Sequence, residues 1–133
     1  MKIYWKLSIR LTNILPFVIF FSVACKSKAP VESVEVSPSL IHLLAERDSV
    51  YTKTVYVKNN SLKNINILEI STSCGCTVAH LKDSIVNSND SVPIDVEYTA
   101  KQNDTGNFVR FVSIRTNGKP PIKTIELKVK IKK

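Results

Sequence analysis

Cys74 and Cys76, separated by a single glycine, are the residues of this sequence with the most distinctive chemistry. An extended chain places residues two apart at about 6.6–7.2 Å between Cα atoms, at or beyond the ~4.4–6.8 Å that a disulfide allows. Gly75 would permit a tighter link, because glycine tolerates positive φ. The small ring that results would be strained and easily reduced, which is typical of a redox-active bridge.

The same pair of cysteines is also suited to a soft metal ion. Thiolates select Cu(I), and His80, four residues after Cys76, is a candidate third ligand if the chain curls back. Zinc normally takes four ligands, and no pattern places the other histidine, His42, nearby. A purely structural interpretation stays open as well, because cysteine packs as a small apolar residue and Gly75 permits a tight corner.

Other chemistry-bearing patterns are weaker. Three triplets resemble the O-glycosylation signal that one phylum of Gram-negative bacteria uses on envelope proteins. They make Ser49, Ser84 and Ser91, each preceded by Asp and followed by Val or Ile, candidate O-glycosylation sites. No glycine-rich phosphate loop is present, and neither histidine belongs to a Ser–His–Asp pattern. The sequence therefore predicts no enzyme.

The third cysteine, Cys25, follows a segment typical of a secretory signal. Residues 1–10 carry positive charges and no acid, and residues 14–24 are apolar but too short for the ~20 residues that span a bilayer. Ser22-Val23-Ala24-Cys25 resembles the lipobox of bacterial lipoproteins, in which the cysteine is linked to diacylglycerol and becomes the new amino terminus. That pattern commonly has Leu where Ser22 stands.

This resemblance divides the chain and predicts where it resides. Residues 1–24 would be a lipoprotein signal peptide, 25–31 the lipidated N-terminus and tether, and 32–133 a folded domain. Acyl chains at Cys25 would anchor the protein to a membrane, since each buried CH₂ contributes ~0.8 kcal/mol. By resemblance to Gram-negative sorting rules, the absence of Asp after Cys25 disfavours retention in the inner membrane, and the absence of an acidic run there disfavours export to the outer face. We therefore expect the inner leaflet of the outer membrane, facing the periplasm.

The charges of the chain argue against a nucleic-acid partner. The formal net charge is +8, but Lys/Arg and Asp/Glu are interleaved, whereas a nucleic-acid protein usually shows a basic stripe with aromatics. One local basic cluster, at Lys128, Lys130, Lys132 and Lys133, alternates with apolar residues. We interpret it as the solvent face of a last strand, with a membrane-contact or polyanion-contact patch as the alternative.

From about residue 31 the apolar residues recur with a period of two, which predicts β-strands. A change of parity between Ile67 and Leu68 suggests a bulge before the cysteines, and Pro93 suits an edge position. The stretch 40–44 is apolar but of undecided type. Seven or eight short strands without a convincing amphipathic helix predict an all-β fold, an immunoglobulin-like antiparallel β-sandwich.

Several of these segments together resemble one bacterial family. They are Asn59-Asn60-Ser61, Ser73-Cys74-Gly75-Cys76-Thr77, Thr105-Gly106-Asn107-Phe108 and Ile114-Arg115-Thr116-Asn117. This arrangement is similar to the DUF1573 family of Ig-like domains, common in secreted lipoproteins, over roughly residues 45–131. The family usually has Asn-x-Gly at 59–61 and Pro-Gly within 88–90, and both departures fall in turns.

The resemblance implies a fold more firmly than a function, because the biochemical role of the family is not established. Related Ig-like domains mostly act as binding or scaffold modules. We therefore expect an envelope lipoprotein with a non-catalytic module that binds an envelope protein or glycan, without a cofactor. The alternative is a thiol-redox or Cu(I)-binding protein that acts through Cys74 and Cys76.

Overall fold

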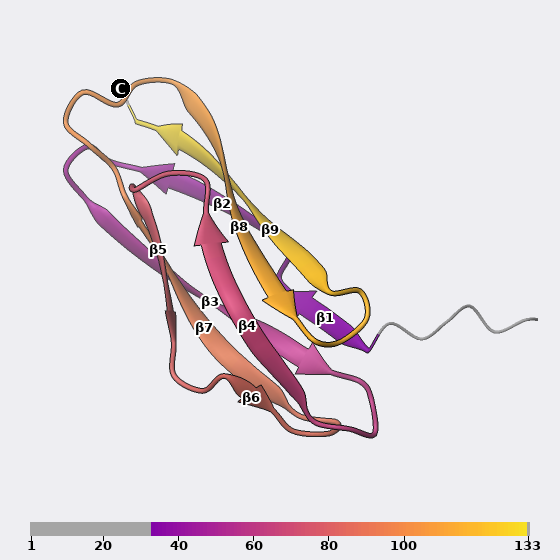
Figure 1. The fold of residues 1–133 in the computed structure, drawn as a ribbon. Helices are drawn as coiled ribbons and strands as arrows, with labels where there is room; N and C mark the ends of the chain where they lie inside the picture. Colours follow the sequence, from indigo (N-terminus) through magenta and orange to yellow (C-terminus); the bar gives the residue numbers. More distant parts are fainter. Residues whose placement is uncertain (1–32, 133) are drawn as a thin grey trace, which may run out of the picture.

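The computed structural model describes residues 33–132, which form nine β-strands and no helix (Figure 1). The strands are β1 (Val34–Ser37), β2 (Leu40–Ala45), β3 (Val50–Asn59), β4 (Ile65–Thr72), β5 (Thr77–Leu81), β6 (Ile85–Val86), β7 (Ser91–Thr99), β8 (Asn107–Thr116) and β9 (Ile122–Ile131). None of the described segments forms an apolar helix of membrane-spanning length. The predicted signal peptide, Cys25 and tether lie outside the described residues.

The strands form two sheets that pack face to face, which confirms the predicted Ig-like sandwich. A four-stranded sheet has the order β1-β3-β7-β5, and a five-stranded sheet has the order β2-β9-β8-β4-β6. The predicted number of strands was too low. The undecided stretch at 40–44 is part of strand β2.

The sequence had predicted an antiparallel sandwich, but one pair of strands is parallel. Strand β2 runs parallel to β9, from Leu40 opposite Glu126 to Ala45 opposite Ile131. Strand β1 pairs with β3 in the other sheet, so the chain changes sheets at Pro38 and Ser39. A period of two identifies the faces of a strand but carries no information on its direction.

Alternation of apolar and polar residues places one face of each long strand in the core. Val55, Ile94 and Ile114 are fully buried, together with many other valines and isoleucines of both sheets. Burial of each such side chain contributes about 1.5–3 kcal/mol, and β-branched residues suit a pleated, half-buried surface. The core is thus built from the same residues that produced the period of two.

The predicted bulge is present in β4. The register between β4 and β8 shifts between Ile67 and Glu69. After the shift, Ile70 pairs with Ile114 and Thr72 pairs with Val112, so even-numbered residues of β4 now face the core. The bulge therefore sets the face on which the chain enters the cysteine turn.

The prediction that Pro93 occupies an edge strand was wrong. Strand β7 lies between β3 and β5, and Pro93 pairs with Tyr56 of β3. The pairing of β5 with β7 extends only from Tyr98 back to Ile94, so Pro93 has no partner on the β5 side. Pro93 is tolerated because one side of β7 is open at that position, even though the strand is internal over most of its length.

The sandwich has two distinct ends. At one end, Ser33 donates its backbone N–H to the carbonyl of Lys119 at 2.8 Å; we call this the Ser33 end. At the other end, the turn from β4 to β5 carries the cysteines, and β9 finishes beside β2, with the N–H of Lys132 bonded to the carbonyl of Ala45. Figure 1 shows the β4–β5 turn far from the start of β1. We call this second end the cysteine end.

Candidate functional site: the cysteine turn

Cys74 and Cys76 are joined by a disulfide in the turn between β4 and β5. Their Cα atoms are 5.2 Å apart, closer than an extended link would place them. We had expected a positive φ at Gly75 to shorten the link between the cysteines. Among the described residues, however, the glycine with a positive φ is Gly106. A Cβ added at Gly75 would meet no atom within 4 Å. The turn is therefore open on its outer side.

The N-terminal half of the turn is bonded to β8. The N–H of Ser73 donates to the carbonyl of Phe111 at 2.9 Å, and the N–H of Phe111 donates to Oγ of Ser73 at 2.9 Å. The hydroxyl of Thr72 donates to the carbonyl of Cys74 at 3.1 Å. These bonds continue the β4–β8 ladder up to the first cysteine.

The C-terminal half of the turn is bonded to the other sheet. The N–H of Thr99, in β7, donates to the carbonyl of Cys76 at 2.9 Å, and the N–H of Thr77 donates to the carbonyl of Cys74 at 3.2 Å. The cysteine turn thus joins the five-stranded sheet to the four-stranded sheet. Its backbone is fixed on both sides while its sulfurs remain at the surface.

The sulfurs lie above a buried hydroxyl. Oγ1 of Thr77 is 3.4 Å from Sγ of Cys74 and 3.9 Å from Sγ of Cys76, and Thr77 is 2% exposed. Both cysteines are half-buried, and Cys76 packs against the core.

Beneath the turn, Tyr98 pairs with Thr77 across β5 and β7. Burial is the main cause that raises the pKa of Tyr98, and the nearby carboxylate of Asp104 raises it further. The phenol therefore stays protonated at neutral pH and donates to Oδ2 of Asp104 at 3.4 Å. The residue beside the cysteine turn on β7, Tyr98, is thus protonated and hydrogen-bonded.

The structure does not bring His80 together with the cysteines. His80 lies on β5 with its Nε2 atom 4.0 Å from Oε2 of Glu97 and its side chain 61% exposed. His42 is on β2 in the other sheet. Within residues 33–132 there is no group of three or more His, Cys, Asp or Glu side chains that could hold a metal ion. Cu(I) binding stays a prediction for the reduced cysteine pair.

The three candidate O-glycosylation sites differ in exposure. Ser49 is half-buried before β3, whereas Ser84 and Ser91 are exposed beside β6 and at the start of β7. The hydroxyl of Ser49 donates to the carbonyl of Arg47 at 3.4 Å. Exposure makes Ser84 and Ser91 the more accessible pair, and their modification stays a prediction.

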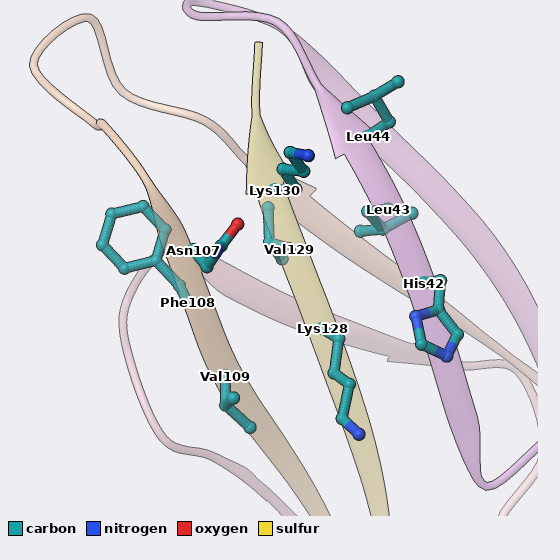
Figure 2. A pocket seen from close by; sticks show the side chains of 9 residues that line it. All are labelled: His42, Leu43, Leu44, Asn107, Phe108, Val109, Lys128, Val129 and Lys130. Atoms are coloured by element: carbon teal, nitrogen blue, oxygen red, sulfur yellow. The ribbon is translucent and has the colours of Figure 1, made fainter.

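Sequence reasoning missed a second feature, a groove on the outer face of the five-stranded sheet (Figure 2). The groove has a volume of about 480 Å³. Its walls are His42 and Leu44 on β2, Lys128 and Lys130 on β9, and Val109 on β8. The predicted solvent face of Lys128, Lys130 and Lys132 is confirmed by their exposure. The groove was not foreseen, because it depends on β2 lying beside β9.

The family model that matches this chain covers residues 42–131 and is described as "Protein of unknown function (DUF1573)". The chain belongs to the DUF1573 family. The match includes the cysteine turn and every strand from β3 to β9. No curated protein sequence matches the chain.

Solved structures share the fold at low sequence identity. A protein of unknown function from Porphyromonas gingivalis W83 matches with a TM-score of 0.62 and 12% identity, over 74% of this chain and 46% of that one. The PapD-like domain 7 of human CEP192 matches with a TM-score of 0.64 and 9% identity, over 80% and 89%. The YadV chaperone matches with a TM-score of 0.59 and 13% identity, over 76% and 53%.

These likenesses establish the fold alone. The domain has the Ig-like, PapD-like sandwich fold of these proteins. The chain spans less than half the length of the Porphyromonas protein.

Proposed function

We propose that this protein is a lipid-anchored protein of the bacterial envelope whose sandwich is a non-catalytic binding or scaffold module. The observation that carries the proposal is the Ig-like, PapD-like fold, which resembles binding and chaperone domains. The signal-like segment before Cys25 supports the anchor. The partner would be another envelope protein or a glycan, met at the periplasmic side of the outer membrane.

The anchor is tested by the mass of the native protein. The mature chain should begin at Cys25, carry acyl chains, and incorporate a palmitate analogue during growth. A Cys25→Ser variant should lose the label and leave the membrane fraction. A native chain that retains residues 1–24, or one that begins after them without lipid, would contradict the anchor. The same spectrum reports hexose additions at Ser84 or Ser91.

The binding role is tested by cross-linking in intact cells. A photo-reactive residue placed on each exposed face of the domain should capture a discrete envelope partner from at least one face. The double variant Cys74→Ser, Cys76→Ser should capture the same partner and retain the phenotype of the gene. Loss of the phenotype in a folded double variant would instead favour chemistry at the cysteines.

A second candidate function is thiol–disulfide exchange at Cys74 and Cys76. Its specific support is a disulfide across one residue in a surface turn, with both cysteines half-buried. A thiolate of a partner dithiol would attack one sulfur, break the Cys74–Cys76 bond and form a mixed disulfide. The second partner thiol would then release the reduced pair and leave the partner oxidised.

This candidate is tested by equilibration with glutathione buffers and quantification of free thiols. A redox-active pair should change state within the range of envelope thiol couples, and the reduced pair should be assayed for Cu(I) by competition with a colorimetric chelator. A pair that stays oxidised under all buffers and, once reduced by a strong reductant, ignores Cu(I) would exclude both chemistries.

A further inference from the structure

Strand β2 is the last strand of the five-stranded sheet and pairs on one side with β9. Two backbone hydrogen bonds show which residues of β2 direct their N–H and C=O groups toward β9. The carbonyl of Ser39 accepts from the N–H of Glu126, and the carbonyl of Ala45 accepts from the N–H of Lys132, each at 2.8 Å. In a parallel pair, the residues that bond to the partner strand alternate with residues that bond away from it. Odd-numbered residues of β2 therefore face β9.

It follows that the even-numbered residues of β2, Leu40, His42 and Leu44, point their backbone N–H and C=O groups at the open edge. Within residues 33–132, no strand pairs with this edge. One more strand can add to such an edge by pairing with its row of unpaired N–H donors and C=O acceptors. These outward-pointing backbone groups recur every two residues along the strand, or about every 6.8 Å.

The side chains of two of these residues, His42 and Leu44, form one wall of the groove described above (Figure 2). His42 lies opposite Lys128, and Leu44 lies opposite Lys130. A second hollow, of about 610 Å³, shares Leu44 and Lys130 and continues to Lys132. The first hollow spans β2, β9 and β8, and the two hollows together extend along β9 from Lys128 to Lys132.

The groove is cationic and only partly neutralised. Nζ of Lys128 is 3.5 Å from a carboxylate oxygen of Glu126, and Lys132 is paired with Glu46. The side chains of His42 and Lys130 have no hydrogen-bond or ion-pair partner in the described part of the chain. The two lysines of the groove are two residues apart on β9, which gives them the same ~6.8 Å repeat as the open edge.

We propose that the edge of β2 and its groove bind an extended, acidic segment of an envelope protein by strand addition. The added strand would exchange backbone hydrogen bonds with Leu40, His42 and Leu44. Carboxylates on its alternate residues would reach toward Lys128 and Lys130, and apolar residues would contact Leu44. This inference rests on the proposed binding function and names the class of partner. A lipid surface would leave the backbone edge unused, so a peptide fits the observations better.

The test uses the full chain in neutral detergent and a fluorescein-labelled, N-acetylated peptide of about ten residues that alternates Glu and Val. Fluorescence anisotropy should show saturable binding that weakens with added salt. The variant Lys128→Glu, Lys130→Glu should bind about tenfold more weakly or worse, because like charges then face the peptide. The matched control Lys53→Glu, Lys58→Glu, at two exposed positions of β3 in the other sheet, should bind as the parent does. Equal binding by the two variants would overturn the proposal.

A second probe isolates the backbone and leaves the protein unchanged. The same peptide with N-methylated amides at alternate positions retains its charges but loses the donors on one edge. One of the two N-methylated registers should abolish binding, and hydrogen exchange should show new protection at the amides of Leu40, His42 and Leu44 with the unmodified peptide. Undiminished binding by both N-methylated peptides would overturn strand addition.

Vesicles that contain phosphatidylglycerol provide the competing outcome. If a lipid-free form prepared by Cys25→Ser binds these vesicles through Lys128 and Lys130 but ignores the peptide, the groove is a membrane-contact patch and the proposal fails. The binding function is judged separately. If a partner is cross-linked from another face and the protein does not bind the peptide, strand addition at the β2 edge is refuted but the proposed binding role of the domain is retained.

Discussion

The two ends of the sandwich are held together by different means. At the Ser33 end, the fully buried Asn59 donates from Nδ2 to the carbonyls of Lys63, Val86 and Asn87 at 2.8–3.0 Å. Its Oδ1 atom accepts from both the N–H and the hydroxyl of Ser61, at 2.9 and 2.7 Å. At the cysteine end, one covalent bond closes a turn whose side chains are half-exposed.

The two ends differ in packing as well. A Cβ added at Gly118, at the Ser33 end, would lie 2.3 Å from Cγ2 of Val34, whereas one at Gly75 would meet nothing within 4 Å. The Ser33 end is therefore a closed, close-packed region specified by hydrogen bonds. The cysteine end has open space around Gly75, so packing places fewer constraints on which residues can occupy the turn.

The largest effect is expected from Asn59→Ala. The substitution removes the five hydrogen bonds of a buried side chain, three donated by Nδ2 and two accepted by Oδ1, which should lower the free energy of unfolding by about 3 kcal/mol. Urea titration followed by circular dichroism measures it. The neighbouring control Asn60→Ala removes a single exposed bond to Glu35 and should cost well under 1 kcal/mol. If the two variants lose similar free energies of unfolding, the hydrogen bonds of the Asn59 side chain do not stabilise the Ser33 end.

Gly118→Ala should come next. The new methyl group overlaps Val34, so either the strand or the turn must move, at a cost of about 1–3 kcal/mol. Gly75→Ala is its counterpart at the cysteine end and should change the unfolding free energy by less than about 0.5 kcal/mol. If Gly75→Ala proves the more damaging of the two, the contrast between a packed end and an open end is wrong.

Removal of the disulfide should have a smaller effect. Cys74→Ser, Cys76→Ser releases a loop of three residues, for which chain entropy predicts a loss of about 1.6 kcal/mol. The circular dichroism spectrum should keep its β-sheet form, because the turn retains its backbone bonds to β8 and β7. Global unfolding of the variant at room temperature would mean that the cysteine end, too, is essential to the core.

The smallest effect concerns an exposed ion pair at the cysteine end. Nζ of Lys132 lies 2.6 Å from Oε1 of Glu46, and its hydrogen bond and charge hold the pKa of Glu46 below its ordinary value. The pair therefore stabilises the fold above the pKa of an unfolded glutamate and loses this contribution as pH falls through the lower pKa of the folded state. NMR titration of Lys132→Gln should show the pKa of Glu46 returning upward. An unchanged pKa would show that the pair does not persist in solution.

Much of the fold could be predicted from the sequence, because strands such as β7 and β9 bury every second residue. The bulge was predictable from the parity change after Ile67. The parallel pairing of β2 was not, since Leu40–Ala45 carries the same alternation whichever way it runs. The groove at Lys130 was missed for the same reason, because its second wall comes from a strand about ninety positions earlier in the chain.

The candidate site was predictable only in part. Cys74 and Cys76 stood out by type and spacing, and the backbone had the room to bring them together. The distance from His80 to the pair could not be predicted, because residue count along β5 says nothing about which way the imidazole leans. The role of Asn59 in its turn was hidden as well, since its partners Val86 and Asn87 come from a later part of the chain.

The distance between the two ends has a consequence for how the sulfurs are reached. Strand β4 runs from Ile65, at the Ser33 end, to Thr72, which leads into the cysteine turn, and its eight residues span about 24 Å. If the chain is held at its amino terminus, the disulfide sits at the tip of a short stalk, beyond most lipid head groups. Anything that reduces or reads it would have to arrive from the aqueous side, as a diffusing molecule rather than as a neighbour in the bilayer.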